Sequence, residues 1–296
     1  MTASIDTALV TQFNDMVHVE AEQKKSRMRG MVKEIPVVGN EYAYERLDNV
    51  EDIEITTRHA DTVAQDITHT RRRIKMRDFA ATLYLDNFDD LQTLINPKAE
   101  YAAAVARTMN RRFDLIALEA ALATVYTGKN FGTSVSAATD GVSTISTGGT
   151  NLTYEKLLEI KENFINADVG VDEDEEINIA ITGSQHTALM KEQELTSGDF
   201  NREYAIEKGK ITKALGMNII LFEGASSKFL TKTTNTRDCI AFSNRGICVG
   251  INKDIGIEVN QRPDKNNLWQ VQARFFLGGV RTEGSLIQKV QCDESA

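Results

Sequence analysis

The sequence has few of the residues that build cross-linked or metal-stapled folds. Its cysteines are Cys239, Cys248 and Cys292, an odd number without a CxxC spacing. This pattern indicates neither a disulfide framework nor a zinc site. The first two cysteines could face each other across a hairpin, but a turn at residues 244–246 sets Cys248 opposite Ala241 or Phe242. We therefore expect buried thiols.

Long apolar runs and excess positive charge are also missing. No run approaches the roughly 20 apolar residues that cross a bilayer. Asp6 comes early, with no basic region before an apolar core, unlike a secretory signal. The chain has 34 Lys and Arg against 43 Asp and Glu, a net charge of −9, which argues against sequence-specific nucleic-acid binding. We expect cytoplasmic synthesis and no membrane partner.

Three stretches carry residues that enzymes or ion sites use, but none has the required spacing. The Gly-, Ser- and Thr-rich residues 128–151 contain neither GxxxxGK[ST] nor GxGxxG after a strand. The acidic run at 172–176 lacks the EF-hand pattern. His186 lies two positions after Ser184, and side chains two apart on a helix point in different directions. We expect solvated loops, a surface histidine, and no catalytic, metal or cofactor site.

The longest helical signal covers residues 96–128. Asn96 suits a helix cap, Pro97 a first turn, and Gly128 a left-handed residue after the last turn. The roughly thirty residues between them would span about 45 Å. Apolar positions spaced by threes and fours are Tyr101, Val105, Met109, Phe113, Ile116, Ala120, Ala123 and Tyr126. They predict a long amphipathic helix, either packed on a sheet or acting as a spine that carries several segments outward.

Residues 36–85 alternate apolar and charged side chains, which predicts strands after a turn at Gly39 and Asn40. This stretch has too few apolar residues for a core of its own. Because an isolated two-stranded ribbon is marginal in water, we expect a projecting hairpin that docks elsewhere.

Charges of both signs lie in this hairpin. The candidate site consists of Glu51, Asp52, Glu54, Arg71, Arg72, Arg73, Lys75 and Arg77. These side chains form either a solvated strand face, where exposed ion pairs add about 0–1 kcal/mol each, or a charge-matched contact with a neighbouring subunit. Nucleic acid is a third alternative, against which the acidic residues argue.

Beyond residue 151, helical and strand signals alternate. A helix is predicted at residues 152–168, with the apolar set Leu157, Leu158, Ile160, Phe164 and Ile165. INIAIT predicts a buried strand, Ser184 a helix cap, and Ile211 with Leu215 a helix before a strand at 219–222. This alternation indicates an α/β subdomain. After residue 238, CIAFS, GICVGI, IGIEVNQR, LWQVQARFFLG and SLIQKVQ predict strands that the long helix is available to cover.

The order of these parts resembles the major capsid proteins of tailed bacteriophages, which share the Hong Kong-type capsid fold. The similarity rests on INIAITGSQHTALMKEQELTSGDFN followed by KGKITKALGMNIILFEG, on ARFFLGGVRTEGSLIQKV, and on DITHTRRRIKMRDFAATLYLDNFD in the hairpin. It implies an α+β fold with an N-terminal arm (1–35), an extended β-hairpin loop (36–88), a peripheral domain with the spine helix (89–150), an apical domain (151–237) and a β-rich return to the peripheral domain (238–296).

The resemblance also implies a function. It suggests a coat protein without enzymatic activity, whose hexamers and pentamers form an icosahedral virion shell around double-stranded DNA after assembly in the bacterial cytoplasm. Implied partners are further copies of the chain, a separate scaffolding protein, a portal and non-specifically contacted DNA, which an acidic coat would not grip tightly. Two alternatives are an encapsulin-like nanocompartment shell and a cytoplasmic α/β enzyme, although no nucleophile, base and orienting group come together in the sequence.

Overall fold

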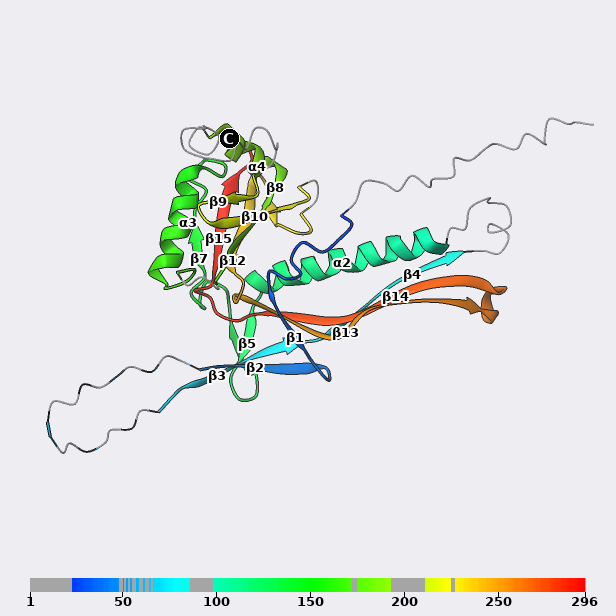
Figure 1. The fold of residues 1–296 in the computed structure, drawn as a ribbon, viewed down its shortest axis with the longest axis horizontal. Helices are drawn as coiled ribbons and strands as arrows, with labels where there is room; N and C mark the ends of the chain where they lie inside the picture. Colours follow the sequence, from blue (N-terminus) through cyan, green and yellow to red (C-terminus); the bar gives the residue numbers. More distant parts are fainter. Residues whose placement is uncertain are drawn as a thin grey trace, which may run out of the picture. The chain divides into compact units, whose positions relative to one another are not determined.

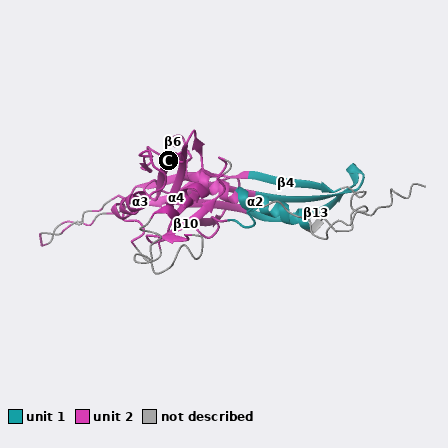
Figure 2. Ribbon diagram, turned by 90° about the horizontal axis from the view of Figure 1, so that it is seen from above, with its two compact units in different colours: residues 1–26, 78–112, 253–275 teal, residues 27–77, 113–252, 276–296 magenta. Residues whose placement is uncertain are grey.

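The computed structural model describes residues 23–47, 50, 52, 54, 57–58, 61, 64, 66–85, 98–171, 175–192, 211–224 and 227–295. They form two compact units (Figure 2). The first takes its described residues from 78–112, 253–275 and the stretch ending at Ser26, and the second from 27–77, 113–252 and 276–296. The fold mixes helices and strands, which confirms the predicted α+β class. The division into five segments along the chain stays a prediction.

A seven-stranded sheet forms the centre of the second unit. Its strands, in order, are β7 (Ser143–Ile145), β15 (Ile287–Asp293), β12 (Thr236–Ser243), β8 (Ile177–Thr182), β10 (Met217–Phe222) and β9 (Lys213–Ala214), with β11 (Lys232–Thr233) paired to β12. β8 is parallel to β10 and antiparallel to β12. All its residues are buried, as the apolar run INIAIT predicts for a strand covered on both faces.

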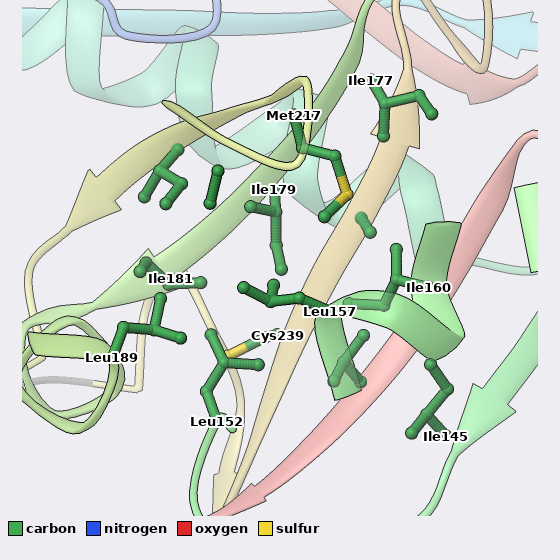
Figure 3. Packing of buried hydrophobic residues seen from close by; sticks show 14 of the residues in the cluster. Ile145, Leu152, Leu157, Ile160, Ile177, Ile179, Ile181, Leu189, Met217 and Cys239 are labelled. Atoms are coloured by element: carbon green, nitrogen blue, oxygen red, sulfur yellow. The ribbon is translucent and has the colours of Figure 1, made fainter. Parts of the chain in front are cut away.

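Helix α3 (Tyr154–Asn166) packs on this sheet (Figure 1). It begins after Thr153, whose side chain accepts the backbone N–H of Lys156. Leu157 and Ile160 lie beside sheet residues in the apolar core (Figure 3). Two members of the predicted apolar set are wrong, because Leu158 is 45% and Ile165 50% exposed. Each directly follows a buried position, and one residue turns about 100° around a helix, which takes it off the buried face.

Helix α4 (Gly183–Lys191) follows β8 directly. Its cap is Thr182 rather than the predicted Ser184, and the amide oxygen of Gln185 accepts the Thr182 backbone N–H at 3.2 Å. The helix predicted over Ile211 and Leu215 is also wrong. β9 and β10 instead pair antiparallel around Leu215 and Gly216, whose φ angles are 50° and 78°, as a tight hairpin turn requires.

Helix α2 (Lys98–Leu122) is the predicted long helix. Asn96 and Pro97 lie outside the described residues. The helix ends before Gly128, because residues 125–127 form strand β5 (Val125–Thr127). Gly128 does have positive φ, 92°, but in the turn that leads from β5 to β6 (Thr133–Val135). A short β-strand therefore replaces the last predicted turn of helix, and its Tyr126 is 42% exposed.

The buried face of α2 in the second unit covers strand β14 (Leu268–Arg281), as expected from the sequence. A Cβ placed on Gly279 of β14 would lie only 2.9 Å from the Ala120 Cβ of the helix. Asp114 is fully buried on α2 and accepts the backbone N–H groups of Arg27 at 2.9 Å and Met28 at 3.1 Å. In the first unit, Arg112 of α2 lies over the Phe79 ring at 4.8 Å.

Two further sheets have four strands each. One has the order β1 (Lys33–Pro36), β13 (Ile247–Arg262), β14 and β4 (Arg77–Leu85), with the 3₁₀ turn η2 (Pro263–Lys265) between β13 and β14. β12 pairs with β8 and β15, whereas β13 pairs with β1 and β14. The hairpin considered for Cys239 and Cys248 therefore does not form. All three cysteines are free and buried, which confirms the expectation of buried thiols.

The other four-stranded sheet has the order β2 (Glu41–Leu47), β3 (His69–Lys75), β5 and β6. β2 and β3 confirm the predicted strands. Their base docks on this same chain, where Ile74 of β3 joins Val37, Met76, Val125, Cys248 and Val280 in a small apolar cluster. No helix among the described residues has the length and apolarity of a membrane span.

Candidate functional site

The β2–β3 ladder has two chemically different faces. Its register sets Glu41 opposite Lys75, Ala43 opposite Arg73 and Glu45 opposite Arg71. Because side chains alternate along a strand, these residues share one face. Arg72 and Ile74 belong to the other face and are buried, at 5% and 0% exposed. The basic run is thus divided between solvent and the interior.

The outer face holds exposed ion pairs within the chain. Arg71 Nη2 lies 2.8 Å from Glu45 Oε1, and Arg73 Nη1 lies 3.4 Å from Glu41 Oε1. The Arg73 guanidinium also lies 4.6 Å from the centre of the Tyr126 ring. Such exposed contacts contribute about 1 kcal/mol or less each, so they leave the face available for a partner.

Arg72 belongs to a buried charge cluster with Asp140 and Arg281. Its Nη1 and Nη2 atoms lie 2.7 and 2.8 Å from the two oxygens of Asp140. Arg281, fully buried on β14, brings its Nε within 2.7 Å of Asp140 Oδ2. The Nη1 of Arg281 donates to the carbonyl oxygens of Ala121 and Ala123 at 2.8 and 3.0 Å. The cluster therefore joins β3, the 136–142 loop, β14 and the end of α2.

The electrostatics of the cluster favour ionised Asp140. Burial alone would raise the pKa of this carboxyl, but hydrogen bonds from Arg72 and Arg281 outweigh burial and lower it. The carbonyls at the α2 C-terminus carry partial negative charge, which partly offsets that of Arg281. Arg72 thus has an intramolecular role and does not belong to the exposed outer face of the ladder.

The other candidate residues lie at the surface or outside the described residues. Arg77 Nη2 lies 2.8 Å from Glu119 Oε2, and both side chains are about half exposed, at 47% and 50%. Lys75, Asp52 and Glu54 are exposed. Glu51 lies outside the described residues. The acidic partners of Arg71 and Arg73 come from β2 rather than from residues 51–54.

Sequence reasoning missed Asp140 and Arg281. Asp140 lies in the Gly-, Ser- and Thr-rich stretch, where nothing sets it apart from other loop carboxylates. Arg281 had a usable signal, because it ends an apolar strand after Gly278 and Gly279. An arginine in such a strand is buried only with a partner.

A pocket of about 780 Å³ opens beside the charge cluster in the second unit. Its lining comes from the hairpin base, the β5–β6 turn, the 139–141 loop and the segment after β14. Its lining includes Arg46, Thr70, Arg71, Arg72, Thr127, Lys129, Thr139, Asp140, Glu283 and Ser285.

The other candidates considered from sequence have structural partners. His186 is half-buried, and its Nε2 accepts the backbone N–H of Ile211 at 3.1 Å. The Oγ of Ser184 accepts a hydrogen bond from Asn151 at 3.3 Å. Of the acidic run, Glu175 lies 2.7 Å from Arg245. No metal-binding cluster of acidic, His or Cys side chains occurs in the described part of the chain.

Comparisons with known proteins give a family and a fold. The phage capsid protein family matches residues 5–294. No curated protein matches. Among solved structures, a chain of Mycobacterium phage Che8 is 14% identical with a TM-score of 0.70, covering 94% of this chain and 95% of that one. The Cyanophage Pam1 capsid asymmetric unit gives 10% identity, a TM-score of 0.73, and coverage of 100% and 99%. At these identities the solved structures establish the fold.

Proposed function

This chain belongs to the phage capsid protein family, and on that premise we propose how its copies build the shell. The capsid interpretation made from the sequence is confirmed at the level of the family, and the nanocompartment and enzyme alternatives are not favoured. The proposed assembly consists of hexamers and pentamers that close an icosahedral shell around double-stranded DNA. Copies of the chain contact one another through the extended hairpin, whose base is the β2–β3 ladder.

The observation that supports this contact is a set of exposed apolar side chains on and next to the hairpin. They are Val38 at 96%, Tyr42 at 36%, Leu47 at 58%, Val50 at 58% and Ile67 at 46% exposed. They are distributed along the hairpin from the segment before β2 to the residues beyond the β2–β3 ladder, and exposed apolar side chains of this kind can be covered by a partner. The charged outer face lies beside them, and complementary charges set the register of such a contact.

We assign further proposed roles to the charged residues of the hairpin and to the other segments of the chain. Arg71, Arg73, Lys75 and Arg77, with Glu51, Asp52 and Glu54, are the proposed charged contacts between subunits. Residues 1–35 act as the arm, 151–237 as the apical domain, and 89–150 with 238–296 as the peripheral domain. A separate scaffolding protein and a portal take part in assembly in the host cytoplasm. The packaged DNA is contacted non-specifically, because the chain carries a net charge of −9.

The test shortens the hairpin without disturbing its base. Removing the whole stretch from Val38 to Arg77 would also delete buried Arg72 and Ile74, so a failure to assemble could reflect lost stability. Leu47 and His69 instead face each other in the ladder, so Asn-Gly in place of residues 48–68 closes a tight hairpin. A matched control replaces residues 48–68 by a Gly-Ser segment of equal length.

We expect the full-length chain to form capsomers or shells in sedimentation velocity and electron microscopy. The shortened chain and the Gly-Ser chain should keep their circular dichroism spectrum and thermal stability but remain small. Full-length protein that stays monomeric at every concentration would contradict the shell proposal. Shells that close as well from the shortened chain would contradict only the role of the hairpin.

A further inference from the structure

The pocket beside the charge cluster has more positive than negative side chains. Four cationic residues line it: Arg46, Arg71, Arg72 and Lys129. Its carboxylates are Asp140 and Glu283, and both already have cationic partners. Asp140 is bound by Arg72 and Arg281, and Glu283 lies 3.6 Å from Arg46. A locally positive pocket is notable in a chain with a net charge of −9.

Arg72, which lines the pocket, and Arg281, which shares Asp140 with it, retain buried donors without a partner among the described residues. The side chains of Arg72 and Arg281 are 6% and 0% exposed, and they share the single carboxylate of Asp140. Among the described residues, Arg72 Nε and Arg281 Nη2 have no hydrogen-bond partner. A buried charged donor without a partner is unfavourable, because it has lost its hydration and gained no hydrogen bond in return. The α2 carbonyls partly offset the charge of Arg281 but do not contact Arg72.

The walls and rim supply the remaining groups that an anion requires. Thr70, Thr127, Thr139 and Ser285 also line the pocket. The hydroxyls of Thr70 and Thr127 donate to backbone carbonyls at 3.5 Å, and that of Thr139 lies 2.8 Å from Ser136 Oγ. The Ser285 hydroxyl can donate a hydrogen bond to an anion oxygen. Lys129 is exposed at the rim. Guanidinium groups match the paired oxygens of phosphate and carboxylate groups.

We propose that this pocket binds an oxyanion group, a phosphate or a carboxylate. The anion lies between Arg72 at the floor and Lys129 at the rim and balances the charge that Asp140 leaves uncompensated. Two sources can supply it. One is free inorganic phosphate, and the other is a side-chain carboxylate of a second copy, for which residues 48–54 offer Asp48, Glu51, Asp52 and Glu54. The site exists in the single chain and does not depend on the proposed shell.

The first experiment titrates dilute full-length protein with inorganic phosphate at constant ionic strength and follows thermal unfolding. Specific binding raises the melting temperature along a saturating curve, whereas the general exclusion effect of phosphate rises without saturation. Lys129→Glu should weaken the apparent phosphate affinity about tenfold or more, because it reverses a charge beside the anion. Lys213→Glu, a reversal at an exposed position on β9 outside the pocket, should leave the curve unchanged.

The second experiment replaces phosphate by a peptide of residues 48–57 (DNVEDIEITT), with its Asp and Glu residues changed to Asn and Gln as the control. Saturable stabilisation by phosphate but not by the peptide supports a free-ion site. Stabilisation by the acidic peptide alone, lost in Lys129→Glu, supports a carboxylate from a second copy. Equal responses of wild type and Lys129→Glu to both probes, or no response to either, would overturn the proposal whether or not the chain forms shells.

Discussion

Apolar side chains from α3, α4 and six strands fill the core on the seven-stranded sheet, with Leu157, Ile179 and Phe164 fully buried among them. The described residues of the β2-β3-β5-β6 sheet contribute to a small apolar cluster around Ile74. Its buried interior includes the Arg72, Asp140 and Arg281 side chains. One sheet is thus stabilised mainly by apolar burial, and the other by a few apolar contacts together with a charge cluster.

This difference bears on what each sheet can do. The seven-stranded sheet covers its apolar residues with helices of the same chain. The hairpin sheet leaves Val38 and Leu47 exposed at 96% and 58%, while its base is fixed by oriented hydrogen bonds. In the proposed assembly this base orients the hairpin toward a neighbour, and the exposed apolar residues are the ones that the neighbour would cover.

The largest expected effect comes from removing the shared carboxylate. Asp140→Ala leaves Arg72 and Arg281 buried without their counter-ion, which should lower the free energy of unfolding by about 3–5 kcal/mol. Urea unfolding of dispersed subunits measures this loss. The control is Arg71→Gln, which breaks an exposed pair and should change stability by less than about 1 kcal/mol. If the two variants were equally stable, the charge cluster would not be what holds the hairpin base.

The seven-stranded sheet should respond to loss of apolar volume. Leu157→Ala removes a fully buried side chain of α3 and should reduce the free energy of unfolding by about 2–5 kcal/mol, from lost burial and the cavity that remains. Leu158→Ala makes the same chemical change one position along, where the side chain is 45% exposed, and should reduce it far less. Similar losses in the same urea experiment would mean that α3 packs differently on the sheet.

Sequence patterns correctly predicted the helices and strands whose structure depends on their local sequence rather than on pairing with distant segments. INIAIT is apolar at four of its six positions and forms the buried strand β8, and the spacing of Leu157, Ile160 and Phe164 located α3. The end of α2 was misjudged, because Gly128 fits a helix end and a hairpin turn equally well. Pairing of β5 with β3 and β6 decided between them, and that pairing depends on residues far apart in the sequence.

The candidate site was predictable only in part for the same reason. Arg71, Arg72 and Arg73 look alike in sequence, and alternation along β3 shows that the middle one faces away from its neighbours. Which face of β3 is buried depends on the C-terminus of α2 and on β14. These elements place the carbonyl of Ala121 and the side chain of Arg281, which bind each other. Asp140 gave no local signal, since its role comes from two arginines more than sixty residues away.

The smallest expected effect concerns a charged group at the edge of the apolar sheet. Glu294 follows β15, its side chain is 10% exposed, and its Oε1 lies 2.9 Å from the Nε of Arg237. Burial alone would raise the pKa of Glu294, but hydrogen bonds from Arg237, Lys232 and Gln185 lower it from 4.5 to about 2. Ionised Glu294 therefore stabilises the fold above pH 4.5, and this contribution is lost as the pH falls from 4.5 through about 2.

The pKa difference corresponds to about 3 kcal/mol or less. Urea unfolding at several pH values between 7 and 2 should show that Glu294→Gln is less stable than wild type at neutral pH and that the two converge in acid. Glu159→Gln, at an exposed position of α3, should run parallel to wild type throughout. Convergence of the wild-type and Glu294→Gln stabilities in acid would show that the seven-stranded sheet also depends on the ionised carboxylate of Glu294, which follows its strand β15. If the Glu294→Gln curve were parallel as well, apolar burial alone would account for the stability of this sheet.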